Sequence, residues 1–301
     1  MPNLESSASI PTITSDRESS PTSPAAACVV NFWGVRGGIP TPGKNTVQYG
    51  GNTVCVEVLV NGQRLVFDGG TGLRVLGQSL LSEMPLEAHL FFTHSHWDRI
   101  QGFPFFTPAF IEGNHFHIYG TAAVNGASMK QRLSDQMLRP HFPLQLQIMQ
   151  ATLEFHDLLP GDMICLGEVT VETASLNYPT RALGFRVSWQ DHAIVYATDT
   201  ECEIGQPNSA LARLAKGADL LIYDIADTAE ECYGPHRTND CWQDGWRTGV
   251  EVAQAAGAKQ LVLMHHSPAY DDAYLDQVSA QLQAAFPKGL VAREGMRLHV
   301  S

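Results

Sequence analysis

The stretch that decides the fold reads Phe91-Phe92-Thr93-His94-Ser95-His96-Trp97-Asp98-Arg99. It begins inside an apolar run, Leu90 to Phe92, which predicts a buried strand of a parallel-type sheet. The loop that follows places two histidines and an aspartate at alternate positions. Imidazole nitrogens and carboxylate oxygens suit zinc, iron or manganese. The stretch therefore predicts a metal-binding loop at the end of a buried strand.

The chain on either side of this stretch alternates apolar strands with helical segments. The expected strands are 29–33, 54–60, 64–67, 116–119, 169–174, 184–189, 193–197, 219–225, 260–264 and 297–300. The expected helices are 127–138, 209–216, 246–256, and two that end near Leu80 and Phe286. Asn61-Gly62 is a strong signal for a hairpin turn between two strands. Polar residues recur at strand ends, which is where α/β folds build their sites.

Composition narrows the function classes. The 301 residues include 19 Lys and Arg and 31 Asp and Glu, which gives a formal net charge of −12. Such a charge argues against a broad nucleic-acid or anionic-membrane surface, although a local basic pocket stays open. No stretch approaches the roughly 20 apolar residues of a membrane span. A small-molecule or phosphate-containing ligand, a protein partner and a homodimer all stay open.

The N-terminal segment and the cysteines bear on organisation and location. Residues 1–26 are rich in Ser, Thr and Pro, so we expect a disordered tail ahead of one domain over 27–301. The six cysteines form no C-x-x-C pair, which is typical of a reducing, intracellular environment. The N-terminus lacks the apolar core of a signal peptide. We therefore expect a cytoplasmic protein.

Several motifs, in order along the chain, resemble those of the metallo-β-lactamase superfamily. They are Trp33 to Gly37, Tyr49 to Thr53, Asp68 to Leu73, His94 to Pro104, Asn177-Tyr178-Pro179, Asp199-Thr200-Glu201 and His265 to Pro268. The chain looks most like the bacterial branch related to tRNase Z and to small cyclic-phosphate phosphodiesterases. The resemblance implies an α/β fold, the four-layer αββα metallo-β-lactamase sandwich.

The resemblance also implies a ligand set. In that family two metal ions share a hydroxide that attacks phosphorus. Carried over to this sequence, the metal ligands are His94, His96, Asp98, Asp199 and His265, with Asp199 as the bridge between the two ions.

Three positions depart from the family pattern. Arg99 stands where the second metal has a histidine, Tyr178 where the first metal has its third histidine, and Gln243 where the branch has a candidate proton donor. Guanidinium cannot ligate a cation, and an amide cannot transfer a proton at neutral pH. Arg99 either turns to solvent or points inward to pair with Asp98 and Asp199. We favour the inward arrangement, because two buried unpaired carboxylates would be costly.

The roles of several other residues follow from the same comparison. Tyr178 either ligates a metal through its phenolate or forms a hydrogen bond in the pocket. Asp68 is expected to support the histidine loop, and His266 to lie behind the ligands. The Pro- and Phe-rich segment 102–110 is expected to pack beneath the loop rather than to form the wall of a cleft. Ordinary surface or packing roles are expected for the histidines without ligand spacing, which are His89, His115, His117, His141 and His156.

Two functions of different classes remain. The first is a degenerate family member with weak or no hydrolase activity and a binding, sensing or regulatory role. The second is a mononuclear metal-dependent hydrolase of a phosphodiester or another small ester. It would use one zinc, iron or manganese ion and the catalytic residues Asp98, Arg99 and Tyr178. The three replaced positions favour the first.

Overall fold

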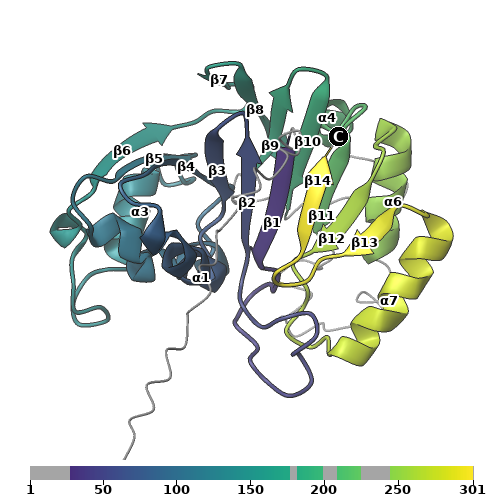
Figure 1. The fold of residues 1–301 in the computed structure, drawn as a ribbon, viewed down its shortest axis with the longest axis horizontal. Coiled ribbons are helices and arrows are strands. Elements are labelled where there is room, and N and C mark those ends of the chain that lie inside the picture. Colours follow the sequence, from purple (N-terminus) through teal and green to yellow (C-terminus); the bar gives the residue numbers. More distant parts are fainter. Residues whose placement is uncertain (1–27, 177–181, 199–208, 225–244, 301) are drawn as a thin grey trace, which may run out of the picture.

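The computed structural model describes residues 28–176, 182–198, 209–224 and 245–300. These residues form two packed sheets with helices on both outer faces (Figure 1). The predicted four-layer αββα sandwich is confirmed. The tail predicted over residues 1–26 lies outside the described residues.

The first sheet has seven strands in the order β14-β1-β2-β3-β4-β5-β6. These are β1 (Cys28–Gly34), β2 (Cys55–Val60), β3 (Gln63–Phe67), β4 (Glu87–Phe92), β5 (His115–Gly120), β6 (Thr152–Asp157) and β14 (Arg297–Val300). The predicted hairpin joins β2 to β3, and its turn residues Asn61 and Gly62 have φ of 45° and 77°. Strands β3 to β6 are parallel, so their carboxyl ends meet at one edge of the sheet.

The second sheet also has seven strands, in the order β13-β12-β11-β10-β9-β8-β7. These are β7 (Met163–Leu166), β8 (Val169–Leu176), β9 (Ala182–Trp189), β10 (His192–Ala197), β11 (Leu220–Asp224), β12 (Leu261–Met264) and β13 (Gly289–Val291). Strands β10 to β13 are parallel. Each half of the chain therefore contributes a parallel segment whose carboxyl edge can carry site residues.

Helices cover the outer face of each sheet. The described α-helices are α1 (Thr71–Ser79), α2 (Trp97–Ile100), α3 (Met129–Asp135), α4 (Ser209–Leu214), α6 (Gly245–Ala256) and α7 (Asp272–Ala285). Short 3-10 turns are η1 (Leu80–Ser82), η2 (Phe103–Phe105), η3 (Thr107–Phe110) and η4 (Leu146–Ile148). Helices α1 and α3 lie on the side of the first sheet, and α4, α6 and α7 on the side of the second (Figure 1). Among these helices none is long and apolar enough to cross a membrane.

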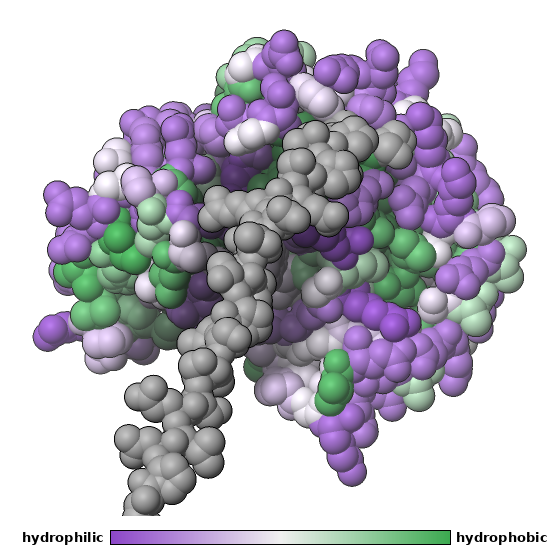
Figure 2. Space-filling model, in the orientation of Figure 1, coloured by the Kyte–Doolittle hydropathy of each residue, from purple (hydrophilic) through white to green (hydrophobic). Residues whose placement is uncertain are grey.

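The apolar core has three parts that correspond to the layers. The part between the sheets contains a ring cluster in which Phe67 and Phe91 stack with centroids 5.4 Å apart and Phe185 lies 5.5 Å from Phe91. The other two parts lie between each sheet and its own helices. In the view of Figure 2 the surface is mainly hydrophilic, with apolar residues at the left, over the helices of the first sheet, and another apolar group to the right of the centre.

The structure adds three strands that were not predicted, β6, β7 and β13. All three lie at or next to the end of a sheet, and each is short or partly exposed, so their apolar signal is weak. The segment 102–110 packs beneath the loop as expected, since Phe103 and Phe106 are buried. Phe105 is the exception, with 55% of its surface exposed.

Candidate metal centre

The histidine loop follows β4 and is supported from β3. The main-chain N–H and the hydroxyl of Thr93 donate to Asp68 Oδ1 over 2.9 and 3.0 Å. The hydroxyl of Tyr196 donates to Asp68 Oδ2 over 2.9 Å. Burial raises the pKa of Asp68 to about 6, against the opposing effect of the Arg99 charge. The predicted supporting role of Asp68 is confirmed.

His94 and His96 lie side by side at the tip of this loop. Their ring centroids are 4.3 Å apart and the ring planes are nearly perpendicular. His94 is buried, and its Nδ1 lies 3.0 Å from Thr93 Oγ1. Burial, followed by the positive charge of Arg99, holds the pKa of His94 well below its ordinary value. The ring is therefore neutral at physiological pH, the state in which imidazole ligates a metal.

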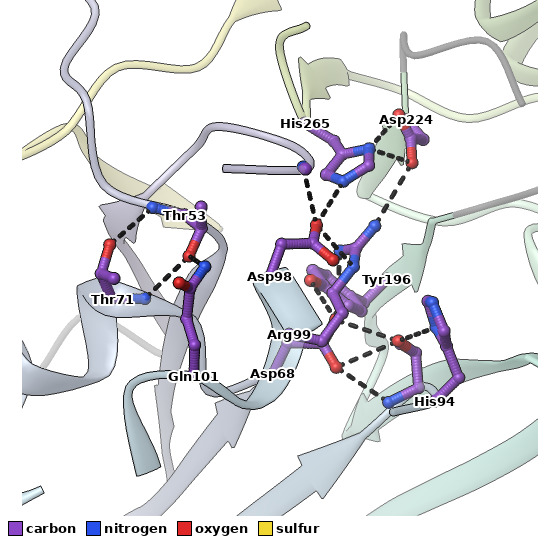
Figure 3. A network of polar contacts seen from close by, with 12 residues as sticks. Thr53, Asp68, Thr71, His94, Asp98, Arg99, Gln101, Tyr196, Asp224 and His265 are labelled. Atoms are coloured by element: carbon purple, nitrogen blue, oxygen red, sulfur yellow. Dashed lines mark hydrogen bonds and ion pairs between the residues drawn. The ribbon is translucent and has the colours of Figure 1, made fainter. Parts of the chain in front are cut away.

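Arg99 points inward, as predicted, and its side chain is fully buried. Its Nη1 donates to Asp68 Oδ2 over 3.2 Å and its Nη2 to Asp224 Oδ2 over 3.4 Å (Figure 3). Its Nε lies 3.7 Å from Asp98 Oδ2. The expected partner Asp98 is present, and Asp68 and Asp224 are further partners. Asp199, the other expected partner, lies outside the described residues.

His265 joins the two halves of the site. Its Nε2 lies 2.8 Å from Asp98 Oδ2, and its Nδ1 lies 2.8 Å from Asp224 Oδ2. Both contacts are hydrogen bonds to ionised carboxylates only if both ring nitrogens carry hydrogen. The main-chain N–H of Gly38 also donates to Asp98 Oδ2, over 3.1 Å. Burial alone would raise the pKa of Asp98, but the His265 hydrogen bond and the Arg99 charge hold it well below its usual range.

Glycines allow the loops around the site to approach closely. A Cβ at Gly37 would lie 2.6 Å from His265 Nε2, and one at Gly102 would collide with the main-chain oxygen of Gly70. Thr53 and Thr71 exchange hydrogen bonds, each hydroxyl accepting a main-chain N–H over 2.8 Å (Figure 3). The Gly-rich motifs quoted above therefore have a packing role.

His266 lies behind the site, as expected. It is fully buried, with its Nε2 within 2.8 Å of the Ala292 carbonyl oxygen. Burial lowers the pKa of His266 to about 3. The imidazole is therefore neutral and donates from Nε2 to that carbonyl. It orients the 265–268 segment rather than facing the histidine loop.

The two ion positions implied by the family differ in how well these residues fit them. At the second position, Asp98 and His265 contact each other directly, and the Arg99 guanidinium lies against the same carboxylate. A divalent ion about 4 Å from a guanidinium would be repelled by roughly 8 kcal/mol at an effective dielectric near 20. The described residues therefore do not fit a second ion. At the first position, the neutral ring of His94 and the adjacent ring of His96 fit one ion. Asp199, Tyr178 and Gln243 lie outside the described residues.

Two site residues were not predicted, Asp224 and Tyr196. Asp224 ends the apolar strand β11, and this polar residue at a strand end was a usable signal. Tyr196 lies inside β10, between apolar residues, and nothing in the local sequence separates it from a core tyrosine. Its hydroxyl reaches Asp68 only because the two sheets pack face to face.

Comparison with known proteins agrees with this architecture. The family model described as a β-lactamase superfamily domain matches residues 63–266, and the chain belongs to that superfamily. Ribonuclease Z of Acaryochloris marina (strain MBIC 11017) is 24% identical over 321 residues, spanning 90% of this chain and 97% of that protein. Ribonuclease Z of Synechococcus sp. (strain CC9311) is also 24% identical, over 335 residues, spanning 90% of this chain and 98% of that protein.

Solved structures share the fold. The metallo-β-lactamase fold protein YhfI from Bacillus subtilis superposes with a TM-score of 0.63 at 17% identity, covering 90% of this chain and 98% of that one. A diphosphatase from the PhnP family also gives a TM-score of 0.63, at 18% identity, over 91% of this chain and 98% of that one. At these identities the likeness establishes the metallo-β-lactamase fold.

Proposed function

We propose that the protein is a metal-dependent hydrolase of a phosphodiester or a related phosphate ester, working with one metal ion held at His94 and His96. The observation that carries this proposal is the buried guanidinium of Arg99 among the carboxylates next to an intact histidine pair. The buried guanidinium supplies positive charge at the second ion position, while the first position keeps its histidine pair. The full-length similarity to proteins named ribonuclease Z supports hydrolysis of a phosphate ester.

Each residue has a defined role in this proposal. His94 and His96 hold the ion, with Asp199 as the carboxylate ligand and Tyr178 as a further ligand or a hydrogen-bond donor to substrate. A bound ion supplies Lewis acidity and lowers the pKa of a water molecule. Asp98 stays ionised and can orient that water through its carboxylate. Arg99 has no exposed surface, so it positions Asp98 and Asp68 instead of contacting substrate.

The size of the substrate and the cellular location of the protein belong to the same proposal. The formal charge of −12 favours a small phosphate ester over a long nucleic acid, whose phosphates would be repelled. We also propose a cytoplasmic location, supported by the free thiols of Cys28, Cys55 and Cys165. A precursor tRNA assayed beside a small diester tests the size preference. Faster turnover of the tRNA would contradict it.

The test is turnover of bis(p-nitrophenyl) phosphate with added zinc, manganese or iron. We expect metal-dependent turnover in the wild-type protein. It should be lost in His94→Ala/His96→Ala and in Asp199→Ala, and kept in a variant of an exposed histidine such as His299→Ala. Wild-type turnover equal to that of the double variant, with every metal, would refute the hydrolase.

The second candidate is a binding protein without hydrolytic chemistry. The direct contact between His265 and Asp98 favours it, because this part of the site is already paired internally. Under this alternative, inorganic phosphate or a phosphodiester should raise the melting temperature of the wild-type protein while no product forms. Loss of that shift in the His94→Ala/His96→Ala variant would assign the binding to this site.

A further inference from the structure

A second cluster of ionisable side chains lies on the inner face of the first sheet. Because side chains alternate along a strand, Glu87 and His89 of β4, His115 and His117 of β5, and Glu154 and His156 of β6 share one face. Register places Glu87 opposite His115, His89 opposite His117, and His117 opposite Glu154. We call these six residues the histidine cluster. Strands β5 and β6 reach to the left in Figure 1, beyond the second sheet.

The histidine cluster is separate from the metal centre described above. His89 lies inside β4, three residues before the strand ends at Phe92, whereas His94 lies in the loop beyond that end. The stacked rings of Phe91 and Tyr119, with centroids 4.5 Å apart, occupy the next position along the same face. No residue of the cluster takes part in the hydrogen bonds of Arg99, Asp98 or His265 given above.

His117 is the centre of the cluster. Its Nδ1 lies 3.4 Å from Glu154 Oε2 and 3.4 Å from His156 Nε2. The other oxygen of Glu154 lies 3.0 Å from His115 Nε2. Two imidazole nitrogens and one carboxylate thus converge at a partly exposed place on the sheet face, with His156 beside His117.

His117 also contacts a carboxylate on the opposite side of its ring. Its Nε2 lies 2.9 Å from Glu87 Oε1, while its Nδ1 faces Glu154 and His156. Metal-binding histidines are usually held in this way, with the second ring nitrogen donating to a carboxylate. The ring of His89 also stacks on that of His117 at 4.7 Å and 13°. Both contacts orient His117 before any ligand binds.

We propose that His115, His117 and Glu154 form a further site for a divalent transition-metal ion, separate from the first centre, with zinc as the ion of best fit. Ligand atoms of a tetrahedral ion with bonds of about 2.0–2.1 Å stand roughly 3.3 Å apart, close to the spacings of 3.0 and 3.4 Å given above. One potential ligand atom from each of the first three residues lies within 4.8 Å of the other two. Nitrogen and oxygen ligands in this ratio suit zinc.

A competing ligand set uses the other side of His117. Glu87, His89 and His117 also meet the 4.8 Å spacing. That set uses the Nε2 of His117, which lies 2.9 Å from Glu87 Oε1. Its third member, His89, is buried, and its Nδ1 is directed at the Tyr119 hydroxyl 3.3 Å away. The set around Glu154 is therefore the better site.

The experiment titrates the full chain, stripped of metal with a chelator, with Zn²⁺ alone, and measures stoichiometry and affinity by calorimetry. A His94→Ala/His96→Ala background removes binding at the first centre. About one Zn²⁺ per chain should remain in that background. Adding His117→Ala or Glu154→Gln to that background should lower the affinity for Zn²⁺. The loss should exceed the roughly 10- to 100-fold that follows when only a residue hydrogen-bonded to a ligand is removed. The exposed His141→Ala should leave it unchanged.

Two further results decide between outcomes. His89→Phe keeps a flat ring against His117 and removes the nitrogens, so Zn²⁺ should still bind. Loss of binding in His89→Phe with retention in Glu154→Gln would overturn the assigned ligand set. Absence of Zn²⁺ binding in the His94→Ala/His96→Ala background, together with an unchanged stoichiometry between wild type and His117→Ala, would overturn the site. Circular dichroism of each variant confirms that it is folded.

Discussion

Arg99 supplies a permanent positive charge at a point where three carboxylates converge. Its guanidinium contacts Asp68, Asp98 and Asp224, and all four side chains are buried. Charges in such a position stay desolvated whether or not a partner is present, so the loss of the cation costs more than the loss of a surface ion pair. A stability measurement can therefore test the charge balance of the site without any assay of activity.

Arg99→Ala should lower the free energy of unfolding by about 3–5 kcal/mol, the usual cost of leaving buried partner charges unpaired. Urea unfolding followed by circular dichroism measures the change. Arg297→Ala, at an exposed arginine, serves as the matched control and should change stability little. An Arg99→Ala variant as stable as the control would show that the carboxylates do not need this cation.

Arg99→His should restore a metal ligand at the second position. Added zinc should then bind one more equivalent than in the wild-type protein. It should also raise the melting temperature, because an ion that binds only the folded state stabilises it, by about 2.7 kcal/mol at 100 times its dissociation constant. Elemental analysis and thermal melts with and without zinc provide the readout. Equal stoichiometry in the two proteins would contradict the assigned role of Arg99.

The buried thiol of Cys28 makes the free energy of unfolding depend on pH in the alkaline range. Burial raises the pKa of its thiol from 9.0 to about 12. Between these values the unfolded chain has lost the proton and the folded chain keeps it. This contribution is therefore fully present below pH 9 and is lost as the pH rises toward 12. Between pH 8 and 10.5 wild type should lose about 2 kcal/mol more than Cys28→Ala. Equal losses would refute the shift.

At the scale of elements, the loop after β4 depends on close contact between main chains. Gly102 lies against Gly70, and its N–H donates to the Gly69 carbonyl oxygen over 2.9 Å. This contact holds the segment that follows α2 against the start of α1. The start of α1 and the glycine turn before it therefore support the loop that carries His94, Asp98 and Arg99.

Gly102→Ala should therefore shift the loop, because the added Cβ collides with main-chain atoms that no side-chain rotation can relieve. We expect loss of stability of about 1–3 kcal/mol and weaker zinc binding at the first centre. Gly126→Ala is a less crowded comparison, since nothing lies within 4 Å of its Cβ, although its φ of +83° adds local strain. Unchanged zinc affinity in Gly102→Ala would show that the loop tolerates the displacement.

Elements with a strong local signal were predictable from the sequence, and arrangements made by several strands together were not. The apolar run of β4 and the Asn61-Gly62 turn carry their own signal, and both were predicted correctly. The inward position of Arg99 followed from the cost of unpaired carboxylates. Its pairing with Asp224 depends on how β11 packs beside the histidine loop, which local pattern does not specify.

The histidine cluster is a second arrangement that depends on several strands and could not be predicted from local sequence. The expectation that His89, His115, His117 and His156 have only surface or packing roles rested on their spacing along the chain. Their convergence results from the register of β4, β5 and β6, and β6 itself was not predicted. A shift of the β5–β6 register by one residue would turn His156 to the other face.

At the scale of the whole molecule, the ring cluster between the sheets joins the two halves. Phe91 precedes the histidine loop and contacts both Phe67 and Phe185. Phe91→Ala should lower the free energy of unfolding by about 3–5 kcal/mol, through lost burial and the cavity that remains. Phe105→Ala, at a residue 55% exposed, should cost far less. If urea unfolding gives comparable losses in free energy of unfolding for the two variants, the ring cluster does not stabilise the packing of the two sheets.

The pairing of β1 with β14 has a consequence for synthesis on the ribosome. The first strand forms hydrogen bonds with the last, Cys28 opposite Val300, so one side of β1 has no neighbour while the rest of the chain is being translated. An unpaired strand edge invites association with other chains. In the folded sheet this side of β1 is covered by β14, a shorter strand that begins at the exposed Arg297. A nascent chain stalled just before β14 should therefore recruit chaperones more strongly than the chain that includes β14.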